Sequence, residues 1–95
     1  MLDITDISVS WKGVTRHLTR EEVMKAFDRA PFGSLSDSSP RYFVEIDGVI
    51  KSVDAVFREI VSTPDTFDNS TSEKIARAFE SLGFEVLDRR RHHIR

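Results

Sequence analysis

Cysteine is absent from this chain of 95 residues. Its absence excludes disulfide bonds, a thiol nucleophile and thiolate metal sites, and it is compatible with a reducing cytosol. No apolar run approaches the roughly 18–20 residues that a membrane-spanning helix requires. The segment Met1-Leu2-Asp3 also opens with an acid where a signal peptide carries basic residues. We therefore expect a cytoplasmic protein with no membrane partner.

Glycine is scarce, and the four glycines lie too far apart in the sequence for a phosphate-binding loop. Catalysis would require a nucleophile beside a base, or paired carboxylates in a pocket. The serines instead fall at helix caps and in loops, where they have a structural use. Capping and the helix dipole also explain the acids at the starts of the expected helices, which are Glu21, Glu22, Asp54 and Glu73.

A domain of this length has little room for a pocket of about 300 Å³ or more, the size that a drug-like ligand needs. Histidine offers no metal site, because the neighbours His92 and His93 would point to opposite faces of a strand. No carboxylate or further histidine lies at helical ligand spacing from them. We predict that the protein is not an enzyme, has no cofactor or metal, and takes no small-molecule substrate.

The centre of the chain predicts a hairpin followed directly by a core helix. Alternation of apolar and other residues over 42–46 is typical of a half-buried strand, and Asp47-Gly48 is a strong signal for a tight turn. A short return strand leads to Ser52, a candidate N-cap, and to a helix with an apolar stripe over 53–61. On the other face of this helix we expect a solvated pair between Asp54 and Arg58.

The N-terminal part predicts a strand over 6–11, interrupted at Lys12-Gly13. Residues 14–18 either continue this strand after a glycine bulge or form a loop. Thr19 and Glu22 then form a capping box, which starts a helix that ends before Pro31. Its expected buried stripe consists of Val23, Met24, Phe27 and Ala30. In the loop that follows, Phe32 or Leu35 is the expected anchor.

The C-terminal part predicts a third helix and a last strand. Ser70 and Glu73 indicate a second capping box, and Gly83 is placed to end the helix. The strand begins at Phe84, and residues 88–95 either extend it or form a basic C-terminal extension.

Residues 1–95 therefore form a single domain of the α+β class. We expect a small, mainly antiparallel sheet packed by three helices, in the order β-α-β-β-α-α-β. The residues expected in the core are Val9, Trp11, Val23, Phe27, Val44, Ile46, Val56, Phe57, Ile60, Ile75, Phe79, Leu82, Phe84 and Val86.

The net charge of −2 is unevenly distributed. Residues 12–20 and residues 88–95 each carry +3, whereas the middle of the chain is acidic. The basic residues could form one surface that neutralises phosphates if the first and last strands lie close in the sheet, with Trp11, Tyr42 or an outward Phe43 stacking on bases. These basic residues are Lys12, Arg16, Arg20, Arg89, Arg90, Arg91 and Arg95. The alternative is a solvated tail and a charged loop.

Several segments of the chain together match the pattern of a known family. They are Tyr42-x-Val44-x-Ile46-Asp47-Gly48, a helix entered through Ala55, the loop residue Phe67, Ala76 or Ala78 in the next helix, Leu82-Gly83-Phe84-Glu85-Val86, and the opening Val9-x-Trp11-x-Gly13-Val14-Thr15. Over nearly its whole length the chain resembles the N-terminal head domain of McrA-type modification-dependent restriction endonucleases and its short stand-alone relatives. That resemblance implies proximity to DNA. The chain departs from the pattern at Lys51, where the family tends to have an aromatic residue, and at Asp54, where it tends to have a lysine.

Two functions follow as expectations. The first is an accessory nucleic-acid-binding module that is not an enzyme, has little base specificity and has DNA as its expected partner. The alternative is a protein–protein interaction domain that binds another protein or a second copy of itself through its acidic middle or its exposed aromatic residues.

Overall fold

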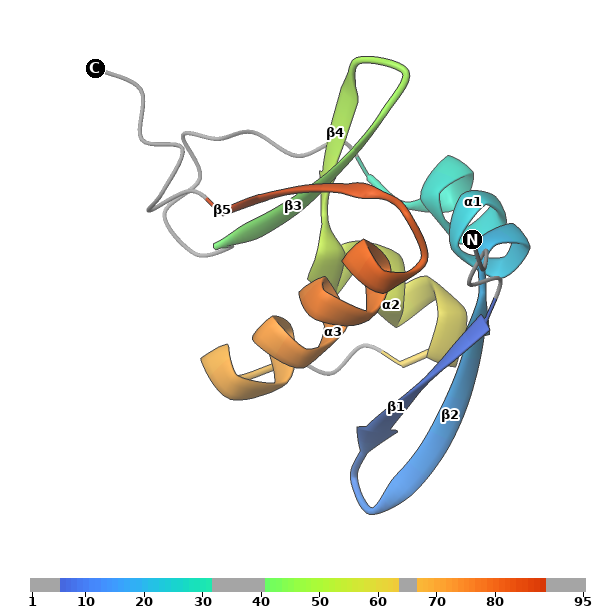
Figure 1. The fold of residues 1–95 in the computed structure, drawn as a ribbon, viewed down its shortest axis with the longest axis vertical. Helices are drawn as coiled ribbons and strands as arrows, with labels where there is room; N and C mark the ends of the chain where they lie inside the picture. Colours follow the sequence, from blue (N-terminus) through green and yellow to red (C-terminus); the bar gives the residue numbers. More distant parts are fainter. Residues whose placement is uncertain (1–5, 32–40, 64–66, 89–95) are drawn as a thin grey trace.

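The computed structural model describes residues 6–31, 41–63 and 67–88. Its elements form an α+β fold with three helices and two small antiparallel sheets (Figure 1). In chain order they are β1 (Asp6–Trp11), β2 (Val14–Thr19), α1 (Arg20–Arg29), β3 (Tyr42–Ile46), β4 (Val49–Ser52), α2 (Val53–Val61), α3 (Asn69–Ser81) and β5 (Glu85–Asp88). The α+β class and the three helices are confirmed. The order expected from the sequence lacks β2. The strands form two sheets, whereas a single sheet was expected.

The first sheet is a hairpin of β1 and β2 that turns at Lys12-Gly13. Both turn residues have positive φ, 51° for Lys12 and 75° for Gly13, as a type I′ turn requires. Trp11 and Val14 are the partners that flank the turn. Residues 14–19 are therefore a return strand, which is neither the bulged continuation nor the loop considered from the sequence.

The second sheet has the order β4-β3-β5, with both pairs antiparallel. Its hairpin turns at Asp47-Gly48, where φ is 53° and 82°, and this prediction is confirmed. β4 passes directly into α2 at Ser52, whose hydroxyl accepts a hydrogen bond from the Ala55 amide at 3.0 Å. The sequence predicted this N-cap correctly.

Helix α3 lies between the two sheets and packs against β1, β3 and β5 (Figure 1). Its N-cap is Asp68, which accepts from the Thr71 amide at 2.8 Å, so the capping box predicted at Ser70 and Glu73 is wrong. Helix α3 ends as predicted at Gly83, whose φ is 94°. There the amides of Gly83 and Phe84 donate to the carbonyls of Glu80 and Phe79, which is a Schellman motif.

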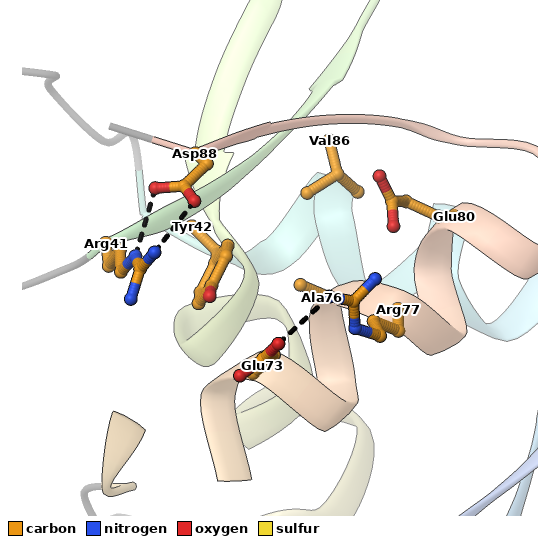
Figure 2. A pocket seen from close by; sticks show the side chains of 8 residues that line it. All are labelled: Arg41, Tyr42, Glu73, Ala76, Arg77, Glu80, Val86 and Asp88. Atoms are coloured by element: carbon orange, nitrogen blue, oxygen red, sulfur yellow. Dashed lines mark hydrogen bonds and ion pairs between the residues drawn. The ribbon is translucent and has the colours of Figure 1, made fainter. Parts of the chain in front are cut away.

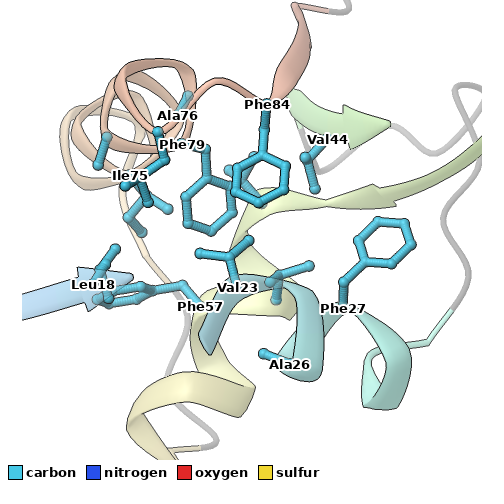
Figure 3. Close-up of a cluster of buried hydrophobic side chains, with 14 of the residues drawn as sticks. Leu18, Val23, Ala26, Phe27, Val44, Phe57, Ile75, Ala76, Phe79 and Phe84 are labelled. Atoms are coloured by element: carbon cyan, nitrogen blue, oxygen red, sulfur yellow. The ribbon is translucent and has the colours of Figure 1, made fainter. Parts of the chain in front are cut away.

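The core gathers side chains from all three helices, β2 and β3 (Figure 3). Most of the expected core residues are buried, but four of them are only half-buried: Trp11, Ile46, Ile60 and Val86. Leu18 on the unforeseen β2 is fully buried. Met24 is wrongly predicted, because 48% of it is exposed. Its neighbours in the helical stripe, Val23, Phe27 and Ala30, are buried as expected.

Candidate functional site

A groove with a volume of about 360 Å³ runs between strand β1 and helix α3. Its lining comes from two consecutive turns of the helix and from the middle of the strand: Ile7, Ser8, Val9, Ser10, Lys74, Arg77, Ala78 and Ser81. The volume exceeds the roughly 300 Å³ at which drug-sized pockets begin. The groove is largely open to solvent, so it does not enclose a ligand as such a pocket does.

One wall of the groove is an unpaired strand edge. In a hairpin with a two-residue turn, the residues that flank the turn form a hydrogen-bonded pair, and such pairs then alternate along the ladder. Trp11, Val9 and Ile7 therefore exchange backbone hydrogen bonds with β2. The amides and carbonyls of Ser8 and Ser10 point away from β2, and among the described residues no other strand pairs with β1.

The other wall of the groove is a face of α3. Lys74, Arg77, Ala78 and Ser81 are spaced i, i+3, i+4 and i+7, so they share one side of the helix. Ala78 is buried, which lets the strand and the helix approach closely, while Lys74 and Arg77 are exposed. The lining contains two cationic side chains and no acidic one. The groove therefore carries a positive local charge although the chain as a whole is acidic.

A second, smaller cavity of about 210 Å³ lies on a neighbouring face of α3, against β3 and β5, and shares Arg77 with the groove (Figure 2). Here acidic and basic side chains compensate one another. Arg41 donates two hydrogen bonds of 3.0 Å to the carboxylate of Asp88, and this pairing raises the pKa of Arg41 above its ordinary value. Arg77 pairs with Glu73 at 3.0 Å across one helical turn. This cavity therefore lacks the net positive charge of the groove.

Two of the predicted nucleic-acid-binding residues hold helix ends in place. Arg16 donates to the Ile60 carbonyl in the last turn of α2 at 3.3 Å, and to Glu22 at 3.4 Å. Arg20 donates to the Leu82 carbonyl at the C-terminus of α3 at 2.9 Å. A cation at a helix C-terminus is favourable because the carbonyls there lack helical partners. These contacts give both arginines a structural role.

Of the other predicted nucleic-acid-binding residues, only Lys12 lies in the part of the chain that the structure describes. Lys12 lies in the β1–β2 turn, with its ammonium 5.2 Å from the centre of the Trp11 ring. Arg89, Arg90, Arg91 and Arg95 lie outside the described residues, as do Phe32 and Leu35 of the expected loop anchor. The proposed joint surface required the first and last strands to be close in one sheet, but β1 and β5 belong to different sheets.

The aromatic residues expected to stack on bases are used in packing. Phe43 is fully buried and Tyr42 is 9% exposed, so the expected outward Phe43 is wrong. Trp11 is half-buried and makes edge-to-face contacts with Phe57 and Phe67, with ring centroids 5.9 Å apart in both pairs. These rings stabilise the fold where α2 meets the hairpin.

Two charged residues of the central region also differ from expectation. Asp54 accepts a hydrogen bond of 2.7 Å from the hydroxyl of buried Ser72, so it links α2 to α3 and is not simply a solvated partner of Arg58. Desolvation at this position raises the pKa of Asp54. Lys51 is buried and donates to the Phe27 carbonyl at the end of α1, with its ammonium 4.6 Å from the centre of the Phe27 ring.

Comparisons with protein-family models, curated proteins and solved structures found no match to this chain. The resemblance to the McrA-type head domain therefore stays a prediction from the sequence. No helix in the described part of the chain is long and apolar enough to cross a membrane. Residues 6–31, 41–63 and 67–88 contain no group of three histidine or acidic side chains arranged to hold a metal ion.

Sequence reasoning missed the groove, although signals for it exist. Ser8 and Ser10 alternate with the apolar residues of β1, and Lys74, Arg77, Ala78 and Ser81 repeat at helical spacing. Each pattern alone is typical of an ordinary solvated face. Only the tertiary structure places the two faces against each other, because they are more than sixty residues apart in the chain.

Proposed function

We propose that this protein is a non-enzymatic interaction module that binds another protein by pairing an extended peptide with the edge of β1. The observation that carries the proposal is the set of backbone groups of Ser8 and Ser10, which face away from β2 in a groove bounded by α3. An exposed strand edge is a template for a further strand. In β-strand addition, main-chain hydrogen bonds supply affinity and side-chain pockets supply specificity.

Strands β2, β4 and β5 are also at sheet edges. Of these, β5 borders a cavity, but its surroundings suit a peptide less well. The cavity beside β5 is smaller, and its charged side chains already pair with one another, as Arg41 does with Asp88. A peptide entering there would have to replace ion pairs whose partners are in place. The β1 groove instead offers the outward-facing backbone groups of Ser8 and Ser10 and two exposed cations, Lys74 and Arg77, of which Arg77 pairs with Glu73 on the surface.

A backbone substitution in β1 tests this proposal. Ser10→Pro removes an amide that does not take part in the β1–β2 ladder, and edge positions of this kind tolerate proline. Ser10→Ala, which keeps the amide, is the matched control. Peptides selected from a random displayed library against the native protein should bind the alanine variant normally and should lose at least about tenfold in affinity for the proline variant, a difference of roughly 1.4 kcal/mol.

Equal binding to both variants, with unchanged melting temperatures, would contradict strand pairing at β1. A library that yields no binder at all would contradict the proposal as a whole. The melting temperature distinguishes a specific loss of peptide binding from unfolding, because a proline that disrupts the hairpin would lower it.

Nucleic-acid binding is a second candidate function, favoured by the charge of the C-terminal segment. Residues 1–87 sum to −5, whereas residues 88–95 carry +3, and the resemblance to the McrA-type head domain points toward DNA. Deletion of 89–95 should then abolish DNA binding. The intact protein should lose affinity as salt rises, by about 0.9 in log K per unit of log salt for each phosphate contact. No DNA binding at low salt would eliminate this candidate.

A further inference from the structure

We infer that the peptide bound in the β1–α3 groove is acidic, with carboxylates on the side that faces α3. The inference rests on the proposed function and goes beyond it by naming the chemistry of the occupant. It follows from three properties of the groove: the charge of its lining, the hydrogen-bonding pattern of its strand edge, and the spacing of its cations.

The charge of the lining selects an anionic partner. Lys74 and Arg77 line the groove from α3, and its lining contains no acidic residue. Arg77 also lines the smaller cavity, where it pairs with Glu73. The Arg77–Glu73 pair is solvent-exposed, with side-chain exposures of 71% and 46%, and such pairs contribute little to stability. Arg77 can therefore turn to a carboxylate in the groove at small cost.

The strand edge distinguishes a peptide from a nucleic acid. Ser8 and Ser10 each present an amide donor and a carbonyl acceptor on the same edge of β1. A second strand satisfies both kinds of group, because it carries donors and acceptors with the same repeat of about 3.3 Å per residue. A phosphodiester backbone offers acceptors alone, so it would leave the two carbonyls facing negative charge.

The same lining disfavours a second copy of this chain. Two β1 edges that pair across a two-fold axis would bring the same surface of both molecules together. Lys74 and Arg77 of one copy would then approach Lys74 and Arg77 of the other. Like charges brought together at an interface oppose association. An acidic segment of a different protein avoids this repulsion.

The spacing of the cations predicts the pattern of the peptide. Lys74 and Arg77 are three residues apart on α3, which corresponds to about 4.5 Å along the helix axis. Alternate residues of a strand lie on one face at a spacing of about 6.6–6.8 Å. Two carboxylates at positions i and i+2 can each reach one of the long, flexible cations. We therefore expect acidic residues that alternate with β-branched residues.

Three synthetic peptides test the inference directly. They alternate valine with glutamate, with glutamine or with lysine, and each carries a fluorescent label for anisotropy titration. The glutamate peptide should bind the native protein at least about tenfold more tightly than the glutamine peptide, and the lysine peptide should bind more weakly still. The preference should shrink as salt rises, because exposed charges are screened.

A charge-reversal variant with a matched control locates the effect. Lys74→Glu combined with Arg77→Glu should abolish the preference for the glutamate peptide and should favour the lysine peptide. Lys25→Glu combined with Arg29→Glu makes the same change in net charge on α1, away from the groove, and should retain the native preference. If the reversal variant does not fold, as judged by circular dichroism, Lys74→Gln combined with Arg77→Gln replaces it.

Each remaining outcome counts for or against the inference. Equal binding of the glutamate and glutamine peptides, with sensitivity to Ser10→Pro, would overturn the acidic preference and leave the proposed function standing. Binding of the glutamate peptide that is insensitive to Ser10→Pro would overturn both. Binding of a thymidine oligonucleotide that is lost with the reversal variant would show a nucleic-acid site. Dimerisation in gel filtration that Ser10→Pro abolishes would show a second copy on the edge.

Discussion

The two hairpins of this protein turn in the same way but differ in what covers their strands. Both have a two-residue turn with positive φ at each position, Lys12-Gly13 in one and Asp47-Gly48 in the other. In the β3–β4 hairpin, β5 pairs with the far side of β3, and α2 begins at the end of β4. In the β1–β2 hairpin, β1 has no second neighbour among the described residues. The β3–β4 hairpin is built into the core, whereas the β1–β2 hairpin presents an edge.

The difference indicates that the β4-β3-β5 sheet mainly supports the core and that the β1–β2 sheet mainly provides a binding edge. Three consecutive residues of β3 are buried, as a central strand packed on both faces should be. Each strand of the other hairpin buries a single residue, Val9 in β1 and Leu18 in β2. We therefore expect substitutions around the β4-β3-β5 sheet to affect mainly stability. Substitutions on the outer edge of β1 should affect mainly binding.

The largest effect on stability should come from Phe57→Ala in α2. The ring is fully buried and contacts Trp11 of the β1–β2 hairpin, with a further edge-to-face contact to Phe67 at 5.6 Å between centroids. Its removal leaves a cavity and should lower the free energy of unfolding by about 3–5 kcal/mol, as urea denaturation would measure. Met24→Ala, at an exposed site, is the control. A native stability for Phe57→Ala would contradict the packing of α2.

Matched lysine substitutions compare the two hairpins directly. Lys51→Met in β4 removes the donor to the Phe27 carbonyl and a buried cation–π contact, so it should cost about 1–3 kcal/mol. Lys12→Met in the other hairpin removes an exposed contact with Trp11 and should cost less than about 1 kcal/mol. Thermal unfolding of both variants would measure the difference. Equal losses would mean that Lys51 does not stabilise the end of α1.

An alanine substitution at Arg20 distinguishes a structural arginine from a phosphate-binding one. Loss of the hydrogen bond to the Leu82 carbonyl and of the contact with Phe84 should lower the free energy of unfolding by about 1–2 kcal/mol. Any affinity for DNA should stay nearly constant. A variant of native stability that loses DNA binding would reverse this assignment and would support the nucleic-acid candidate.

The smallest effect concerns pH and the link between α2 and α3. Burial raises the pKa of Asp54 above its ordinary value of 3.8, so the folded state disfavours the ionised form. The stabilising contribution of this group is therefore full below the ordinary pKa and is lost as pH rises through the raised one. Asp54→Asn removes this pH dependence. The difference in free energy of unfolding, Asp54→Asn minus native protein, should therefore be larger at pH 7 than at pH 3. Urea denaturation of both proteins at both pH values would test this.

The sequence predicted those elements whose signals are local. Asp47-Gly48, the caps at Thr19 and Ser52, and the end of α3 at Gly83 depend on a few neighbouring residues with distinctive backbone preferences. Lys12-Gly13 forms the same turn as Asp47-Gly48, but lysine seldom adopts positive φ and so gives a weaker signal. For that reason the sequence alone does not decide whether residues 14–18 are a strand or a loop, and it does not predict that the strands divide into two sheets.

The candidate site depended on long-range packing, which local patterns do not contain. Charge counting selected Arg16 and Arg20, yet their partners are carbonyls at helix ends in distant parts of the chain. The cations that line the groove, Lys74 and Arg77, had no unusual local composition to mark them. Their role follows only from the approach of α3 to the unpaired edge of β1.

Amide hydrogen exchange, followed residue by residue by NMR, tests the central claim most directly. In the free protein the amides of Ser8 and Ser10 should exchange much faster than those of Val9 and Trp11, because only the latter two donate to β2. Saturation with the valine–glutamate peptide should slow exchange at Ser8 and Ser10 and leave exchange at the outer edges of β2, β4 and β5 unchanged. Unchanged exchange at Ser8 and Ser10 in the saturated complex would contradict strand addition at β1.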